Sequence, residues 1–256
     1  KHRRRQRQMC IRDSNPTVSP EQNKRWYLTD IKPQKQTSDP IIWDLPLRVF
    51  HWLLVLCVVT SVTSAKLGLT AIHERSGLAV MALILFRILW GFSGSQTARF
   101  SSFLKSPLYV WYSLRKLMLK QTDDLSGHSA LGGYATIVLL TICIVMAVSG
   151  SFSTDDILYE GPFAHFAPDY IKLASSVHHM TENALFAVIV LHLLALFVYF
   201  WRLKKNLVPA MITGSRPKAV GPSGAIPLSH TVFGLLLMAA LIGLFQFAPL
   251  LKPSLF

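Results

Sequence analysis

The sequence predicts an all-α membrane protein built around a bundle of transmembrane helices, and two observations carry this prediction. Of the 256 residues, 51% are hydrophobic and only 15% are charged, whereas an average soluble domain has about 25% charged residues. The hydrophobic residues are also gathered into blocks of roughly 18 to 25, and about 20 helical residues are needed to cross a hydrocarbon core of about 30 Å. An ordinary soluble globular protein is therefore excluded.

The segments before the first block are treated separately. Residues 4–14 read as a translated transposase sequencing adapter, so we interpret 1–14 as an artefact rather than as protein sequence. The alternative is a genuine basic arm that binds anionic membrane lipid. Residues 15–41 contain four prolines among mainly polar residues and are predicted to form a disordered cytoplasmic tail.

Five apolar blocks predict five transmembrane helices, at residues 45–67, 73–94, 130–150, 176–203 and 226–250. We expect residues 42–214 to form one transmembrane domain and residues 215–256 to form a linker and an extra C-terminal helix. Between the second and third helices, residues 97–120 mix large apolar residues with Lys105, Arg115 and Lys116. This pattern favours an amphipathic helix on the membrane surface over a short hairpin of loop.

The basic residues that flank the helices predict the orientation in the membrane. Fifteen Lys and Arg residues fall before the first helix, between the second and third, and after the fourth, against four on the other side. The positive-inside rule then places the N-terminus in the cytoplasm and, after five crossings, the C-terminus on the other side, in the periplasm or at the cell exterior. Because this uneven distribution accounts for the net charge of +13, we do not expect binding to nucleic acid.

Four histidines lie within the predicted helices at two depths. Ionisable residues at membrane depth are costly and are functional by default. His51 lies toward the cytoplasmic side of the first helix, and His73 lies toward the periplasmic side of the second. In the fourth helix, His178 and His192 are fourteen residues apart, which is about 40° short of four turns, so both project from one face about 21 Å apart. His179 is rotated by about 220° from His192 and points elsewhere.

These histidines predict two facing pairs. Because the fourth helix runs from outside to inside, His178 matches His73 in depth, and His192 matches His51. Two imidazoles from different helices, at each of two heights, are the ligand set for two b-type haems, which would carry an electron across most of the membrane. The alternatives are hydrogen bonds between helices and a polar divalent-metal path that would use Glu182.

Two arginines and a glycine lie beside the predicted layers. Arg87 follows His73 by fourteen residues, so it should lie on the same face at the cytoplasmic layer, and Arg48 precedes His51 by about one turn. Either guanidinium can pair with a haem propionate or extend toward the membrane interface. Gly77 lies one turn after His73, where the lack of a side chain leaves room for a macrocycle.

Six motifs stand in order along residues 42–214: WDLPLRVFHW, HERSGL, FRILWGFSGS, ARFSSFLKSP, GHSALGG and NLVPAMITG. Together they resemble the bacterial cytochrome b561 family, which includes the cytochrome b subunits of nickel-iron hydrogenases. The resemblance implies a four-helix core that holds two non-covalent b haems. It implies the axial ligands His51, His73, His178 and His192, with Asn183 favouring His178 over its neighbour.

The resemblance also bears on positions outside that ligand set. His128, in the GHSALGG motif, would approach a propionate or a quinone, or would cap its helix. The position after the fourth-helix ligand is usually acidic in the family, whereas here it is His179. The fifth helix is not part of the family core, so its role is open.

The sequence therefore predicts transmembrane electron transfer between the quinone/quinol pool and a redox partner. Whether such a cytochrome b acts as a quinone-linked oxidoreductase is left open by the sequence. The partner would be a periplasmic or membrane protein such as a cytochrome c or a hydrogenase-like subunit. The alternatives are divalent-metal transport and a role as the membrane anchor subunit of a larger redox complex.

Overall fold

The computed structural model of the chain describes residues 39–104, 106–119, 129–154, 159–217 and 223–251. Within these residues, five helices are long and apolar enough to cross a membrane. They are α3 (Leu45–Lys66), α4 (Thr70–Ser93), α7 (Ala130–Ser151), α8 (Ile171–Leu203) and α10 (Leu228–Gln246). The prediction of an all-α membrane protein is confirmed. The adapter segment and residues 15–38 of the predicted disordered tail lie outside the described residues, whereas Ile41, within the predicted tail, forms an antiparallel bridge with Ser215.

The helix boundaries lie within four residues of the predicted ones except at the start of α8. This helix begins at Ile171, five residues before the predicted start, directly after the short 3-10 helices η1 (Ala164–Phe166) and η2 (Pro168–Tyr170). A hydropathy pattern marks the part of a helix that lies in hydrocarbon, so it misses a first turn that extends beyond the membrane core.

The segment between α4 and α7 forms two helices instead of one. They are α5 (Phe100–Phe103) and α6 (Pro107–Met118), so the prediction of a single amphipathic helix over 97–120 was wrong in its extent. Pro107 explains the break, because proline lacks an N–H donor and disfavours a helical residue before it. The apolar side chains of α6 are exposed, with Leu108 at 83% and Trp111 at 70%, as expected for a helix that lies on a membrane surface.

The start of α3 is fixed by a buried carboxylate. Asp44 accepts a hydrogen bond from the backbone N of Leu47 at 2.8 Å, which caps the helix. The same side chain accepts hydrogen bonds from the indole of Trp90 at 3.1 Å and from the hydroxyl of Ser95. Asp44 therefore joins the beginning of α3 to the end of α4.

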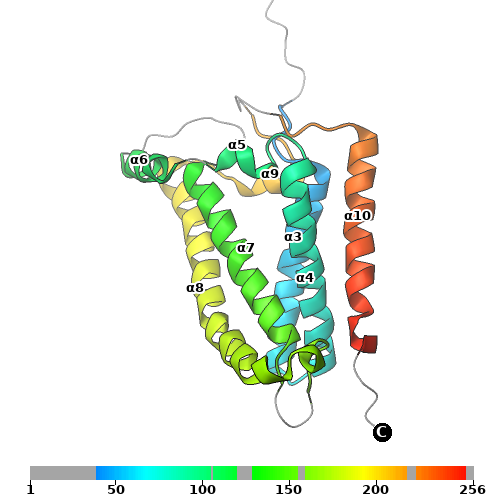
Figure 1. Ribbon diagram of the computed structural model, residues 1–256. Helices are drawn as coiled ribbons and strands as arrows, with labels where there is room; N and C mark the ends of the chain where they lie inside the picture. The colour runs from blue at the N-terminus through cyan, green and yellow to red at the C-terminus, as the bar shows by residue number, and fades with distance from the viewer. Residues whose placement is uncertain (1–38, 105, 120–128, 155–158, 218–222, 252–256) are drawn as a thin grey trace, which may run out of the picture. The chain divides into compact units, whose positions relative to one another are not determined.

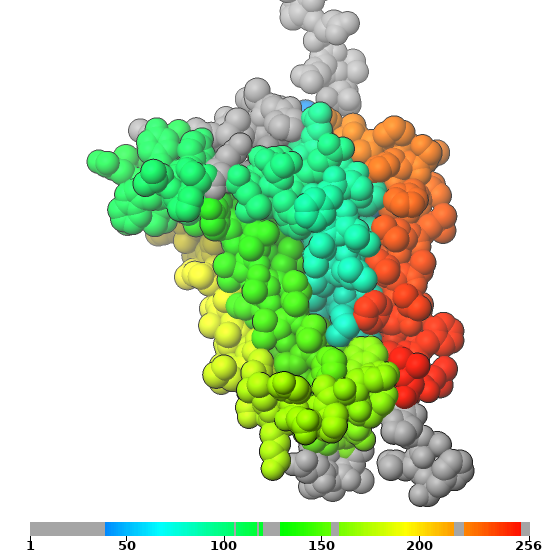
Figure 2. Space-filling model, in the orientation of Figure 1, coloured from blue at the N-terminus to red at the C-terminus, as the bar shows by residue number. Residues whose placement is uncertain are grey.

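The helices form a bundle around α4 (Figure 1). Helix α4 packs against α3, α7 and α10, whereas α8 packs mainly against α7. We call the end of the bundle that carries α5, α6 and α9 (Val208–Thr213) the inner end, and the end that carries the α3–α4 turn and the α7–α8 loop the outer end. Figure 2 shows that α6 stands out from the bundle at a corner of the inner end.

The fifth helix, α10, is firmly packed although it lies beyond the predicted domain. Gly234 sits against the ring of Trp90, where a Cβ atom would come within 2.6 Å. At the inner end, His230 Nε2 lies 2.9 Å from the carbonyl oxygen of Ser93. At the outer end, Arg75 and Gln246 each donate a hydrogen bond to the other's backbone oxygen. Helix α10 is thus attached to both ends of α4.

Candidate functional site

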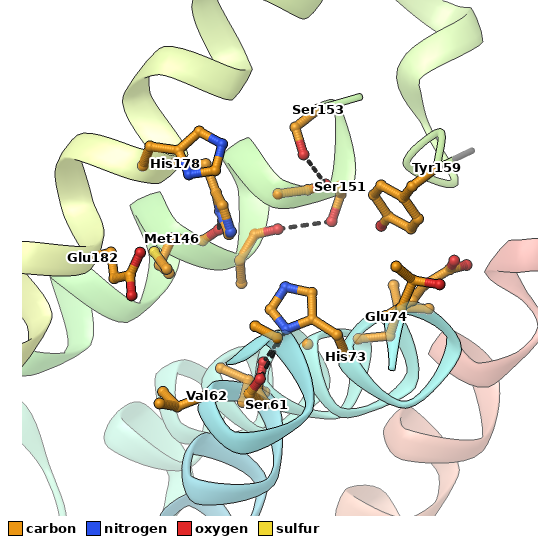
Figure 3. A pocket seen from close by; sticks show the side chains of 18 of the residues that line it. Ser61, Val62, His73, Glu74, Met146, Ser151, Ser153, Tyr159, His178 and Glu182 are labelled. Atoms are coloured by element: carbon orange, nitrogen blue, oxygen red, sulfur yellow. Dashed lines mark hydrogen bonds between the residues drawn. The ribbon is translucent and has the colours of Figure 1, made fainter. Parts of the chain in front are cut away.

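Two of the predicted histidines face each other near the outer end. The rings of His73 on α4 and His178 on α8 have centroids 6.0 Å apart and planes inclined at 79°. Both side chains lie in the wall of a cavity of about 510 Å³ (Figure 3). Cavities of 300–1,000 Å³ are typical of sites for small molecules and cofactors. Two helices that share no large interface therefore present imidazoles to the same space.

The hydrogen bonds of these two histidines fix which ring nitrogen is available. Nδ1 of His73 lies 2.9 Å from the carbonyl oxygen of Ser61, and Nδ1 of His178 lies 3.0 Å from the carbonyl oxygen of Met146. Because a carbonyl oxygen can only accept, each Nδ1 carries the proton. The lone pair of each neutral ring is then on Nε2, which is the arrangement found in histidines that bind metals.

Two glycines shape the same cavity. Gly150 on α7 lies against the ring of His178, and a Cβ atom there would come within 2.7 Å of His178 Cε1. Gly77 on α4 also lines the cavity, and a Cβ atom there would meet no heavy atom within 4 Å. Gly150 therefore allows the imidazole to take its place, and Gly77 faces open space, as the sequence predicted.

The outer rim of the cavity contains an ion pair. Nζ of Lys66, at the end of α3, lies 2.6 Å from Oε1 of Glu182, which follows His178 by one helical turn. Both side chains line the cavity. Glu182, the carboxylate that a divalent-metal path would use, is therefore already paired with the ammonium group of Lys66.

The other two predicted ligands, His51 on α3 and His192 on α8, are close enough to interact electrostatically. The ring of His51 also contacts the ring of Trp52 edge-on, at a centroid distance of 5.1 Å. Nδ1 of His51 is buried and has no hydrogen-bond partner among the residues that the structure describes.

An apolar layer separates the two pairs. Leu185 is seven residues from His178 and seven from His192, so it lies on the same face of α8 halfway between them. It packs with buried residues of α4 and α7, namely Val80, Ile84, Cys143 and Ala147. This apolar cluster therefore lies between the heights of His178 and His192 along α8, and several of its members also line the cavity of His73 and His178.

Arg87 and Arg48 both have protein partners. Arg87 is only 1% exposed, donates a hydrogen bond from Nη2 to the carbonyl oxygen of Ala98 at 3.0 Å, and lies 4.8 Å above the ring of Phe100. Its Nη1 is buried and has no partner within the described residues, so the guanidinium is enclosed by protein. Arg48 donates a hydrogen bond from Nη1 to the carbonyl oxygen of Ile212 in α9.

The remaining predicted histidines contribute differently. His179 is exposed at the cavity edge, and its ring centroid is 5.9 Å from that of His178. The structure thus places His178, and not His179, against His73. His128 lies outside the described residues. Sequence reasoning missed Lys66 and Gly150 as parts of the site, and it missed the carbonyl partners of the two rings.

The donor set suits a macrocyclic cofactor better than a bare ion. In the described part of the chain, no group of three or more His, Cys, Asp and Glu side chains could hold a metal ion. Haem iron receives four ligands from the porphyrin and needs only one or two from the protein. A facing pair of imidazoles is sufficient for that purpose.

Comparisons with known proteins agree with this chemistry. The family model described as prokaryotic cytochrome b561 matches residues 42–214. Two curated relatives, from Escherichia coli strain K12 and from Escherichia coli O157:H7, are each described as "Probable Ni/Fe-hydrogenase 1 B-type cytochrome subunit". Each is 24% identical over an alignment that covers 45% of this chain and 62% of the relative, so the chain spans less than two thirds of their length. No solved structure matches the chain.

Proposed function

Because this chain belongs to the prokaryotic cytochrome b561 family, in which membrane electron transfer uses b-type haem, we propose that it moves electrons across the membrane through two non-covalent b haems. The observation that carries this proposal is the His73–His178 pair, with both Nδ1 atoms bonded to carbonyl oxygens and both Nε2 atoms available in one cavity. His51 and His192 would hold the second haem. A bound haem supplies an iron atom that gains and releases one electron.

The residues around His73 and His178 fit a haem at the outer end of the bundle, which we call the outer haem; the haem at His51 and His192 is the inner haem. The carbonyl oxygens of Ser61 and Met146 orient the two rings and make their Nε2 atoms more basic. Gly77 leaves the space beside His73 open. Lys66 is a suitable partner for a carboxylate of the cofactor, because its ammonium group already binds a carboxylate at the cavity rim.

One unpartnered buried atom supports the inner haem. Nη1 of Arg87 is a buried polar atom without a hydrogen bond in the described parts of the chain. Such an atom is costly unless a ligand or water satisfies it. We assign Arg87 to a propionate of this haem, while His128 stays a prediction for a propionate or a quinone, and Arg48 stays a second candidate for a propionate.

The apolar layer around Leu185 defines the route between the two sites. Its members carry no charged group, so the bundle is apolar between His178 and His192, whose positions differ by about 21 Å along α8. The chain would thus hold two haems at different depths with an apolar region between them.

We further propose that one haem exchanges electrons with the quinone/quinol pool and the other with a redox protein of the periplasm or the membrane. The uneven basic residues support a bacterial inner membrane with a cytoplasmic N-terminus and a periplasmic C-terminus. The description of both relatives as hydrogenase cytochrome subunits favours a hydrogenase-like partner over a cytochrome c. The same description favours a compatible second role, as the membrane anchor subunit of a larger redox complex.

Haem analysis of the purified chain tests the central proposal. Pyridine haemochromogen absorption should give two haems per chain, His73→Ala or His178→Ala should remove one, and His51→Ala or His192→Ala should remove the other. A preparation with no haem would overturn the proposal, and one with a single haem unaffected by His51→Ala would overturn the second site.

A further inference from the structure

The carbonyl oxygen that orients the ring of His73 accepts a second hydrogen bond from a serine. Oγ of Ser64 donates to the carbonyl oxygen of Ser61 at 3.0 Å, and Nδ1 of His73 donates to the same oxygen at 2.9 Å (Figure 3). Ser64 follows Ser61 by three residues on α3, so its hydroxyl reaches back along its own helix. One backbone oxygen is therefore shared between a ligand ring and a hydroxyl group.

The same arrangement occurs at the second ligand, on a different helix. Oγ of Ser149 on α7 lies 3.2 Å from the carbonyl oxygen of Met146, which accepts from Nδ1 of His178 at 3.0 Å. Ser149 follows Met146 by three residues, as Ser64 follows Ser61. Its hydroxyl also lies 2.6 Å from the carbonyl oxygen of Val145, so the proton is divided between two acceptors.

Both serines act at a distance from the cavity. Ser64 is 3% exposed and Ser149 is 7% exposed, and neither lines the cavity that holds the rings of His73 and His178. Ser61 is different, because its own hydroxyl lies 3.1 Å from Nδ1 of His73. Ser64 and Ser149 therefore reach the ligand rings through the shared carbonyl oxygens.

A bond from a serine to an earlier carbonyl oxygen is common in helices and usually has only a local effect. Ser76 on α4 makes two such bonds, to the carbonyl oxygens of Ile72 and His73. The bonds made by Ser64 and Ser149 differ, because the carbonyl oxygen at the other end also holds a ring that is proposed to ligate iron.

We propose that Ser64 and Ser149 are positioning residues that raise the midpoint potential of the outer haem, an inference that rests on the proposed function. A carbonyl oxygen that accepts from Nδ1–H makes Nε2 of the same ring more basic. A hydroxyl that donates to that oxygen draws away part of its electron density, so the oxygen binds Nδ1–H less strongly and Nε2 becomes less basic. A less basic ligand stabilises the ferric state less and therefore favours the gain of an electron.

Redox titration of the purified haem-loaded protein, followed in the α-band, tests the proposal. The outer haem is identified as the component that His178→Ala removes. Ser64→Ala should lower its midpoint potential by about 30 mV, a threefold change in equilibrium constant at 59 mV per tenfold change. Ser149→Ala should lower the same potential by less, because its hydroxyl is shared between two carbonyl oxygens.

Two further variants separate this effect from a loss of packing. Ser76→Ala removes a hydroxyl that is also buried and bonded back along its helix, but the carbonyl oxygens of Ile72 and His73 accept from no histidine ring in the described residues. This variant should leave the potential of the outer haem unchanged. Ser149→Thr keeps a hydroxyl that can make the same bonds and should also retain the parent value.

The outcomes distinguish this inference from the proposed function. An unchanged or raised potential in Ser64→Ala, or an equal decrease in Ser76→Ala, would overturn the role of the serines while two haems remain bound. If Ser64→Ala fails to retain the outer haem, the potential of Ser149→Ala decides by the same criterion. Absence of haem from the parent protein would instead overturn the proposed function.

Discussion

Gly150 and His178 are placed so closely that the ring occupies the volume a side chain at position 150 would fill. The hypothetical Cβ atom lies 2.7 Å from Cε1 and 2.9 Å from Nδ1 of the imidazole. The same Nδ1 atom is hydrogen-bonded to the carbonyl oxygen of Met146 on α7. Helix α7 thus determines the orientation of a ligand that belongs to α8.

The first prediction follows from this contact. Gly150→Ala should push the His178 ring off its carbonyl partner and remove one haem, seen as loss of about half the α-band absorbance. Gly243→Ala is the control, because a Cβ atom at position 243 meets nothing within 4 Å. Two haems with unchanged spectra in Gly150→Ala would show that the ring position does not control ligation.

The second prediction distinguishes neighbouring histidines. His179→Ala should retain both haems, whereas His178→Ala should lose one, because only His178 faces His73 across the cavity. Absorption spectra of the two variants, purified side by side, provide the measurement. Loss of an α-band component from His179→Ala would mean that the wrong neighbour has been assigned.

The third prediction concerns the ion pair at the cavity rim. Adding an electron to a haem adds negative charge, so removing the nearby cation should lower its midpoint potential and removing the nearby anion should raise it. Lys66→Met and Glu182→Gln should therefore shift the potential of one haem in opposite directions, by up to about 60 mV, which is a tenfold change in equilibrium constant for a one-electron couple. Redox titration followed in the α-band measures both, and shifts of the same sign would contradict the assignment.

The fourth prediction tests the layer between the two histidine pairs. Leu185→Ala removes buried methyl groups from a packed cluster, which costs about 2–5 kcal/mol in soluble proteins, and should lower the thermal unfolding midpoint. Leu191→Ala is the matched control on the same helix, because Leu191 is exposed. Equal midpoints for the two variants, measured by loss of helical circular dichroism, would argue against a packed layer.

Much of the fold could be predicted because the bilayer imposes simple lengths and periods. The block of apolar residues at 130–150 became α7 with its end displaced by one residue. The interval between His178 and His192 predicts a shared face, and α8 is the single uninterrupted helix that this prediction requires. The start of a new helix at Pro107 could also have been predicted, because proline is common at the first position of a helix.

Other parts of the site could not be predicted because they depend on which backbone atoms meet in space. Every residue has a carbonyl oxygen, so nothing in the sequence marks Ser61 and Met146 as the partners of the two rings. The Lys66–Glu182 pair joins residues 116 positions apart, and its formation depends on how α3 and α8 are placed around the cavity. The position of α9 against α3 is likewise set by backbone oxygens that accept from Trp52 and Arg48.

The attachment of α10 to α4 has a mechanical consequence. Hydrogen bonds at both ends, between His230 and Ser93 and between Arg75 and Gln246, should make α4 and α10 move as one rigid unit. A tilt or piston movement of α4 that altered the height of His73 would have to carry α10 along with it. A spectroscopic label on the lipid-facing side of α10 would consequently report displacements of an axial ligand that lies on a different helix.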